Sequence, residues 1–216
     1  MIKIQPIVKD VVIKDYEAYI ALTHDYMNMS SYAAKIRPKV EEITKKRVTI
    51  TSLVVSLSRI KREFKKEKSL IHDVAIKNIT TKLPLSEIVY GNNATFMKEL
   101  ESFHRDVAVS QEDFFTITIG TIEVDIICSS NLQKKIVQHF NSKPKIINHN
   151  LAAVGISFDP EVYSVPNTFF SLLAVTARAG VNIEELVSTP TELTFIVDEK
   201  DFGKTVSLFS ELYKAK

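Results

Sequence analysis

In the last third of the chain, the spacing of hydrophobic and polar positions changes from that of a strand to that of a helix. Residues 151–158 have the length and the alternation of a strand. Residues 166–179 follow with apolar positions on one helical face, namely Phe169, Leu172, Leu173 and Thr176. Gly180 then stands where a helix commonly ends in a left-handed residue, a conformation that costs glycine no steric strain. We therefore expect a strand followed by a helix.

Two further strands and a second helix are predicted beyond Gly180. Residues 181–188 and 192–197 alternate or run apolar over strand lengths, and Pro190 lies in the polar break between them, as in a turn. Asp201 is placed to cap the next helix, whose apolar stripe consists of Phe202, Val206, Phe209 and Tyr213. The order strand, helix, strand, strand, helix is that of a ferredoxin-like layer of helices on an antiparallel sheet.

A second, weaker copy of the same order lies upstream. Its second strand pair is clear because Ile122, Val124 and Ile126 alternate with polar residues, and Gly120 supplies the turn. The expected elements are strands at residues 85–90, 114–119, 121–128 and 145–148, and helices at residues 93–104 and 131–140. We interpret the two copies as tandem βαββα units.

The two copies differ at their ends. The first has a closing strand, whereas the second ends in a helix and leaves a sheet edge open to pairing. Residues 72–80 are apolar and β-branched, so they are our candidate for the missing strand. A strand from a second chain is the competing solution. The predicted domains are residues 1–69, 70–149 and 150–216.

Four short motifs in the last copy resemble a known family. They are Val165-Pro166-Asn167 before the helix, residues 179–183 (Ala-Gly-Val-Asn-Ile) after it, Ser188-Thr189, and residues 195–198 (Phe-Ile-Val-Asp). Over residues 151–213 their order and spacing are similar to an ACT domain, specifically the second regulatory module of aspartokinases. The resemblance implies an α+β chain with two ferredoxin-like βαββαβ ACT modules. It also implies that the module senses an amino acid or a similar small metabolite; a fold that serves only in pairing is the alternative.

The resemblance also implies a ligand site. In ACT modules of this type the ligand lies between the first strand and the first helix, against the second strand of a neighbouring module. The residues at matching positions are Phe158, Asp159, Val165, Pro166, Asn167 and Thr168 on one side, and Val181, Asn182 and Ile183 on the other.

This chain departs from the family pattern at Pro166-Asn167, where the family has proline and glycine. The preceding loop is also longer and carries Tyr163. Asparagine tolerates a left-handed backbone, but its side chain fills space that glycine leaves free. A helix cap is the alternative role for Asn167.

Charge separates the first third of the chain from the rest. Residues 1–69 hold 15 Lys or Arg and 8 Asp or Glu, whereas the remaining residues hold 13 and 18. This asymmetry suggests an acidic partner such as nucleic acid or another protein. The periodicity there is helical: residues 14–29 form one expected helix, and Pro38 is expected to break the next one. A later helix carries Leu53, Leu57, Ile60 and Phe64 inward, so the order is that of a helix-turn-helix.

In that interpretation the outward face of the later helix binds DNA. Basic groups would neutralise phosphates, and Ser and Arg side chains would address base edges. The candidate residues are Lys45, Lys46, Arg47, Ser52, Ser56, Arg59 and Arg62, with Thr51, Lys65 and Lys66 beside them. The alternative is a solvated helix face on an interaction or dimerisation domain.

Other function classes find little support. The five glycines and five histidines show neither a phosphate-binding loop nor metal-ligand spacing, so we expect no catalytic residue, no metal and no cofactor. Cys128 forms no internal disulfide and is expected to be buried. No apolar run reaches the length of a membrane span, and we expect a cytoplasmic protein.

Together these features favour a non-enzymatic, amino-acid-sensing regulator of amino-acid metabolism that works as a homodimer. Two alternatives remain: a DNA-binding transcriptional regulator whose ACT modules only dimerise it, and a regulatory subunit that docks on a metabolic enzyme.

Overall fold

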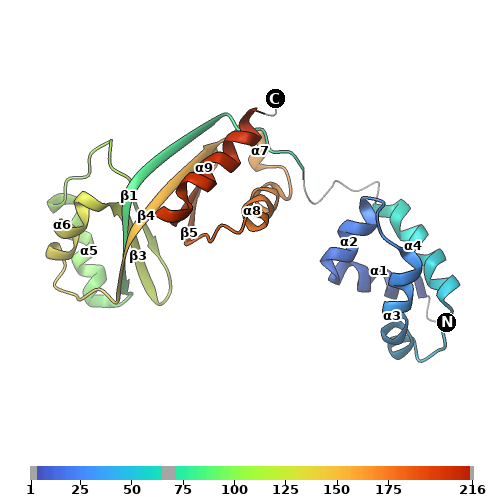
Figure 1. The fold of residues 1–216 in the computed structure, drawn as a ribbon. Helices are drawn as coiled ribbons and strands as arrows, with labels where there is room; N and C mark the ends of the chain where they lie inside the picture. The colour runs from blue at the N-terminus through green and yellow to red at the C-terminus, as the bar shows by residue number, and fades with distance from the viewer. Residues whose placement is uncertain (1–3, 65–71, 215–216) are drawn as a thin grey trace. The chain divides into compact units, whose positions relative to one another are not determined.

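The structure is a computed structural model that describes residues 4–64 and 72–214. The chain divides into two compact units, residues 1–70 and residues 71–216, and each is described by itself (Figure 1). Lys65 and Lys66, which the sequence placed beside the DNA-binding face, lie outside the described residues.

Unit 1 is helical throughout its regular structure. Its helices are α1 (Ile4–Lys14), α2 (Tyr16–Thr23), α3 (Met29–Thr44) and α4 (Ile50–Phe64). Their apolar faces meet in one core, in which Val12, Leu22 and Val40 are fully buried. From α4 the core receives Leu53, Leu57, Ile60 and Phe64, so the inward stripe predicted for this helix is confirmed.

Two sequence predictions in unit 1 are wrong. The helix expected over residues 14–29 is shorter, because Asp15 caps α2 by accepting a hydrogen bond from the Ala18 amide (3.1 Å) and α2 ends at Thr23. Pro38 does not break α3, which continues to Thr44. The burial of Ile36 and Val40 on either side of the proline outweighs the loss of one backbone donor.

Unit 2 is built on a six-stranded antiparallel sheet in the order β2-β3-β1-β4-β6-β5. The strands are β1 (Asn78–Gly91), β2 (Phe115–Ile119), β3 (Glu123–Ser129), β4 (Ile146–Ser157), β5 (Glu185–Thr189) and β6 (Glu192–Asp198). Strands 145–148 and 151–158, predicted separately, are one strand, β4, in which Asn150 adopts a left-handed conformation (φ 59°).

The long strands β1 and β4 each serve both halves of the sheet. Residues 78–82 of β1 pair with β4, and residues 85–91 pair with β3. The first residues of β4, 146–148, pair with β1 near its end, whereas residues 151–157 pair with β6. Of the segment 72–80 that was our candidate for the edge strand, residues 78–80 lie in this ladder and residues 72–77 precede it.

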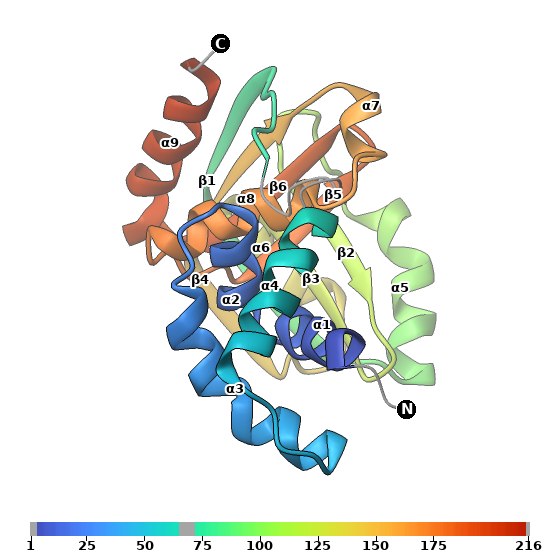
Figure 2. The same cartoon turned by 90° about the vertical axis from the view of Figure 1, so that its right-hand side faces the viewer.

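Helices cover one face of each half of the sheet. They are α5 (Ala94–Asp106) and α6 (Ser130–His139) in the first half, and α7 (Pro160–Tyr163), α8 (Thr168–Arg178) and α9 (Glu199–Lys214) in the second. Figure 1 shows α5 and α6 at one end of the long strands and α7, α8 and α9 towards the other. In the view of Figure 2, α5 and α9 lie on opposite sides of the strands.

Alternation along the strands sends side chains to two different cores. In β3, Val124, Ile126 and Cys128 pack under α5 and α6, and burial raises the pKa of the Cys128 thiol to about 12. In β6, Phe195 packs under α8 and α9, whereas its neighbour Ile196 faces the other way. On that other face a small core joins both halves and contains Leu85, Ile127, Leu151, Ala153 and Ile196.

The start of α9 corrects another prediction. The helix begins at Glu199, and Asp198, not Asp201, accepts a hydrogen bond from a first-turn amide, that of Lys200 (2.9 Å).

Across the described residues, no helix combines the length and the apolar character needed to cross a lipid bilayer.

Candidate functional site

A pocket of about 370 Å³ lies at the start of α8. It is lined by Val165, Pro166, Asn167, Thr168, Phe169 and Phe170. The first four belong to the ligand set that the sequence resemblance implied, and the two phenylalanines come from the first turn of the helix. The described residues that line the pocket form one short continuous segment, which follows the first strand of the second half of the sheet.

The backbone of this segment is shaped by a short helix and a left-handed residue. After β4 the chain forms α7, and the Val165 amide closes it on the Val162 carbonyl (3.0 Å). Asn167 then adopts φ 70°, in the left-handed region, and its side chain makes no capping hydrogen bond to α8. Asn167 thus occupies the N-cap position of α8 in a conformation that glycine favours, but its side chain does not supply the cap that its alternative role required.

Two buried hydroxyls hold the loop against the helix. Thr168 Oγ1 donates towards the carbonyls of Val162 (3.0 Å) and Val165 (2.9 Å). Ser171 Oγ donates to the Asn167 carbonyl (2.9 Å) and accepts from the His72 amide (3.1 Å). The His72 ring lies within 3.5 Å of Thr168 Oγ1. These contacts tie the segment before β1 to the start of α8 and fix the wall of the pocket.

The other predicted ligand residues do not line this pocket. Phe158 and Val181 are buried in the core under α8 and α9. Asp159 is exposed and forms an ion pair with Lys77. Asn182 is exposed, and Ile183 packs against the same core. The structure therefore brings together residues 165–168, whereas residues 181–183 lie on a separate part of the unit.

Sequence analysis missed Phe169, Phe170 and His72 as parts of this site. Phe169 had been assigned only to the apolar helical stripe, and no pattern distinguishes a phenylalanine in a pocket wall from one in a core. His72 is 96 residues from Thr168, so a local pattern could not have placed it there.

A second polar cluster lies on the face of the sheet that carries no helices. Glu87, Asp125 and Glu185 come from β1, β3 and β5, and one oxygen of each lies within 4.8 Å of the others. Thr118 Oγ1 of β2 donates to Glu185 Oε1 (3.1 Å), so the two edge strands approach each other and the sheet is curled.

Burial and neighbouring negative charge raise the pKa of Asp125 to about 8. Desolvation is the largest cause, followed by the hydrogen bond to Glu185 and the charges of Glu185 and Glu87. Asp125 Oδ1 and Glu185 Oε2 are both buried, and neither oxygen has a hydrogen-bond partner among the described residues. Carboxylate oxygens are also the ligands of hard cations such as Ca²⁺, and these three side chains are the ones in the described chain close enough to share such an ion.

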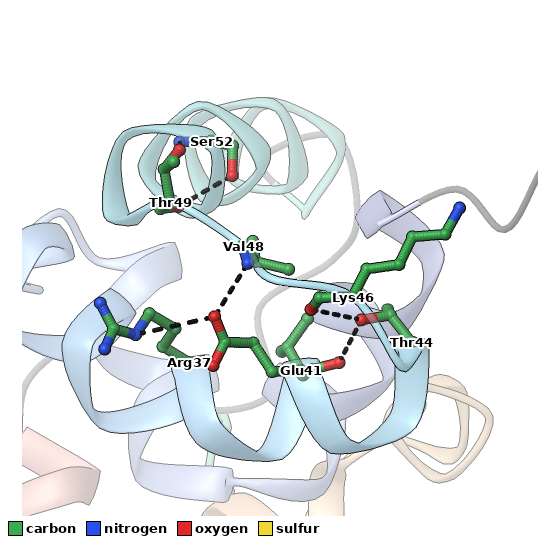
Figure 3. Close-up of polar contacts among 8 residues, drawn as sticks. Arg37, Glu41, Thr44, Lys46, Val48, Thr49 and Ser52 are labelled. Atoms are coloured by element: carbon green, nitrogen blue, oxygen red, sulfur yellow. Dashed lines mark hydrogen bonds and ion pairs between the residues drawn. The ribbon is translucent and has the colours of Figure 1, made fainter.

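The turn between α3 and α4 in unit 1 is held by its own polar contacts (Figure 3). Glu41 Oε1 accepts from the Val48 amide (2.8 Å) and lies 4.0 Å from Arg37 Nε. Thr49 Oγ1 accepts from the Ser52 amide (3.2 Å) and so caps α4. Lys45 ends α3 in a left-handed conformation (φ 54°).

Most of the predicted nucleic-acid residues lie on the surface around this turn and along α4. Lys45, Lys46 and Arg47 are exposed in the turn, and Arg59 and Arg62 are exposed on α4. Ser52 is half-buried. Ser56 is a correction: it is nearly buried and donates to the Ser52 carbonyl (2.9 Å), because the core stripe of α4 includes position 56 as well as position 57.

The fold of unit 2 is similar to that of known structures. Unit 2, with helices on one face of each half of a curled antiparallel sheet, has the fold of aspartate kinase regulatory domains, which are ACT-like. No family model matches the sequence, and no curated protein matches it either.

Solved structures carry the likeness. The regulatory subunit of aspartate kinase from Thermus thermophilus, in its ligand-free form, is 13% identical with a TM-score of 0.53, over 65% of this chain and 100% of that one. Aspartate kinase from Clostridium acetobutylicum is 16% identical with a TM-score of 0.52, over 69% of this chain and 37% of that one. Escherichia coli aspartokinase III in complex with lysine and aspartate is 14% identical with a TM-score of 0.50, over 65% of this chain and 34% of that one. This chain therefore spans about a third of the length of the two complete kinases.

Proposed function

We propose that unit 2 is a non-catalytic regulatory unit that binds an amino acid or a similar small metabolite in the pocket at the start of α8. The observation that carries the proposal is the coincidence of this pocket with residues 165–168, which the sequence resemblance selected independently. Two neighbours of the same fold support it, since one is a regulatory subunit and another is in complex with lysine.

The volume and the lining of the pocket suit a small zwitterion such as an amino acid. Its volume of about 370 Å³ lies near the lower end of the range for small-ligand pockets, about 300 to 1,000 Å³. The positive end of the α8 dipole favours the ligand carboxylate, and Asn167 offers an amide beside it. Val165 and the two phenylalanines give an apolar wall for the side chain of the ligand.

Two ACT-like modules that exchange their edge strands explain the topology best. Residues 78–82 complete the second half of the sheet, and residues 146–148 complete the first. In this proposal the boundaries at residues 70–149 and 150–216 separate modules that cannot fold alone. Asn182, the exposed residue of the predicted set 181–183, would then contact a ligand bound by a second copy of the chain, so the active form is a homodimer.

Thermal denaturation of the full chain in the presence of each of the twenty amino acids tests the proposal. A ligand at 100 times its Kd stabilises the folded state by about 2.7 kcal/mol, so at least one amino acid raises the Tm. Val165→Asp places a negative charge in the pocket and abolishes the shift, whereas Val109→Asp, an exposed position outside the pocket, retains it. If no amino acid changes the Tm at millimolar concentration, the sensor proposal fails.

Docking on a metabolic enzyme stays a prediction from the sequence. A pull-down with the full chain that recovers an enzyme of amino-acid metabolism, and loses it when the amino acid is added, would favour that role over a free-standing sensor.

A further inference from the structure

The basic residues of unit 1 fall into two groups. One group is engaged in ion pairs with acidic side chains and consists of Lys9, Lys14, Lys35, Arg37 and Lys61. Among the described residues the other group has no acidic partner and consists of Lys39, Lys45, Lys46, Arg47, Arg59 and Arg62. Five acidic side chains, those of Asp10, Asp15, Asp25, Glu41 and Glu63, are thus paired with the first group, and positive charge remains at the turn and on α4.

One exposed strip of α4 is uncharged in its first two turns and carries two of the unpaired cations in its last turn. Ser52, Val55, Arg59 and Arg62 are spaced three, four and three residues apart, so they share one face of the helix. Val55 is 46% exposed although it is a large apolar residue. The strip is about 15 Å long at 1.5 Å per residue. Lys45, Lys46 and Arg47 lie before its first end, and the two arginines occupy its last turn.

The turn that presents these cations is already ordered. Glu41 bonds to the Val48 amide and Thr49 caps α4, so the three basic residues project from a fixed loop (Figure 3). Glu41 is turned inward on these contacts and on Arg37. Glu63 of α4 is paired with Lys9. Glu42 is the exposed carboxylate on α3 next to the turn.

We propose that α3, the turn at residues 45–49 and α4 form a helix-turn-helix that places α4 in the major groove of duplex DNA. Cations at both ends of the helix match phosphates on both sides of a groove about 12 Å wide. The uncharged centre offers a serine hydroxyl and the Val55 methyls, which suit base edges and the thymine methyl group. An acidic protein would not require cations separated by an apolar centre of this kind. This site lies in unit 1 and is independent of the pocket in unit 2.

Fluorescence anisotropy of the full chain with a 30-base-pair duplex of mixed sequence tests the proposal. Six phosphate contacts predict a loss of affinity of about 1,000-fold between 50 and 200 mM salt. Arg59→Glu with Arg62→Glu lowers the affinity at least 100-fold at 100 mM salt. Lys134→Glu with Lys135→Glu changes the net charge equally on the exposed face of α6 and changes affinity less than about threefold.

Three results would overturn the proposal. They are an absence of salt-dependent binding by the unaltered chain, an equal loss in both charge-reversal pairs, and binding to a polyglutamate chain as tight as to DNA of equal charge. Arg59→Gln with Arg62→Gln guards against misfolding: with an unchanged Tm and helical circular dichroism, it must still weaken DNA binding at least tenfold. The DNA-binding assay contains no amino acid. A failure of the DNA-binding proposal is therefore distinct from a failure of the sensor proposal.

Discussion

The two halves of the sheet in unit 2 start their first helices in different ways, although both use asparagine. In the first half Asn93 is extended (φ −144°), and its side chain accepts hydrogen bonds from the Thr95 and Phe96 amides (both 3.0 Å). In the second half Asn167 is left-handed and gives α8 no side-chain cap. The first-turn aromatic Phe96 is buried, whereas Phe170 is 37% exposed and lines the pocket.

This difference accounts for the pocket at the start of α8. A capped helix end with a buried aromatic residue has satisfied its own donors and filled its own space. A left-handed residue turns the chain away from the helix end and leaves a pocket there. Asn167 adopts a conformation that glycine favours and adds a side-chain amide at a position that lines the pocket.

The largest expected effect separates the two first-turn aromatics. Phe96→Ala should lower the free energy of unfolding by about 3 to 5 kcal/mol. It removes a ring whose centroid lies 4.5 Å from that of the Tyr90 ring and 4.7 Å from that of the Phe140 ring. Phe170→Ala should cost about 1 kcal/mol or less, since the ring is already partly hydrated. Chemical denaturation of both variants measures the difference, and equal losses would remove this contrast between the halves.

A smaller effect concerns the carboxyls that join the halves. Because the folded-state pKa of Asp125 is raised to about 8 from an ordinary 3.8, the folded chain holds a proton that the unfolded chain releases. The stability contributed by this proton is complete below about pH 4 and is lost as the pH rises to 8. Asp125→Asn should therefore stabilise the protein at pH 8 by about 1 to 2 kcal/mol, less than the full linkage value because the group is partly exposed.

Denaturation curves of Asp125→Asn between pH 4 and pH 9 check the sign. The gain should grow with pH and level off above pH 8. Asn93→Ala, which removes a helix cap and no contact to a carboxyl, serves as the control and should give a pH-independent change. A gain that shrinks with rising pH would contradict the raised pKa of Asp125.

The smallest expected effect compares the two asparagines directly. Asn93→Ala should cost about 1 kcal/mol through the lost cap. Asn167→Gly suits the left-handed backbone and should stay within about 0.5 kcal/mol of the unaltered protein, since no capping bond is lost. Thermal unfolding at a single pH is sufficient, and a large loss for Asn167→Gly would show that its side chain stabilises the fold.

The order of helices and strands in unit 2 could be predicted because each carries its own local signal. The alternation through Val124 and Ile126 and the glycine at position 180, which is left-handed as expected (φ 64°), are examples. Local patterns failed where tertiary packing decided: α3 continues through Pro38, and Asn150 lets two predicted strands join as β4.

The candidate sites divide in the same way. Residues 165–168 could be found because they are contiguous. Glu87, Asp125 and Glu185 meet only through the curl of the sheet, and neither the spacing of these residues nor their neighbours in the sequence predicts it. The sequence placed Ser56 on the exposed face of α4, but a shift of one position along a helix moves a side chain from the exposed strip to the core stripe.

Amide chemical shifts during titration with the stabilising amino acid test the central claim most directly. The account predicts that the amides of Val165 and of residues 167–170 move with a common Kd, whereas the matching amides of residues 92–97 at the start of α5 do not. Shifts confined to other parts of unit 2, or of equal size at both helix starts, would contradict a ligand site at the start of α8.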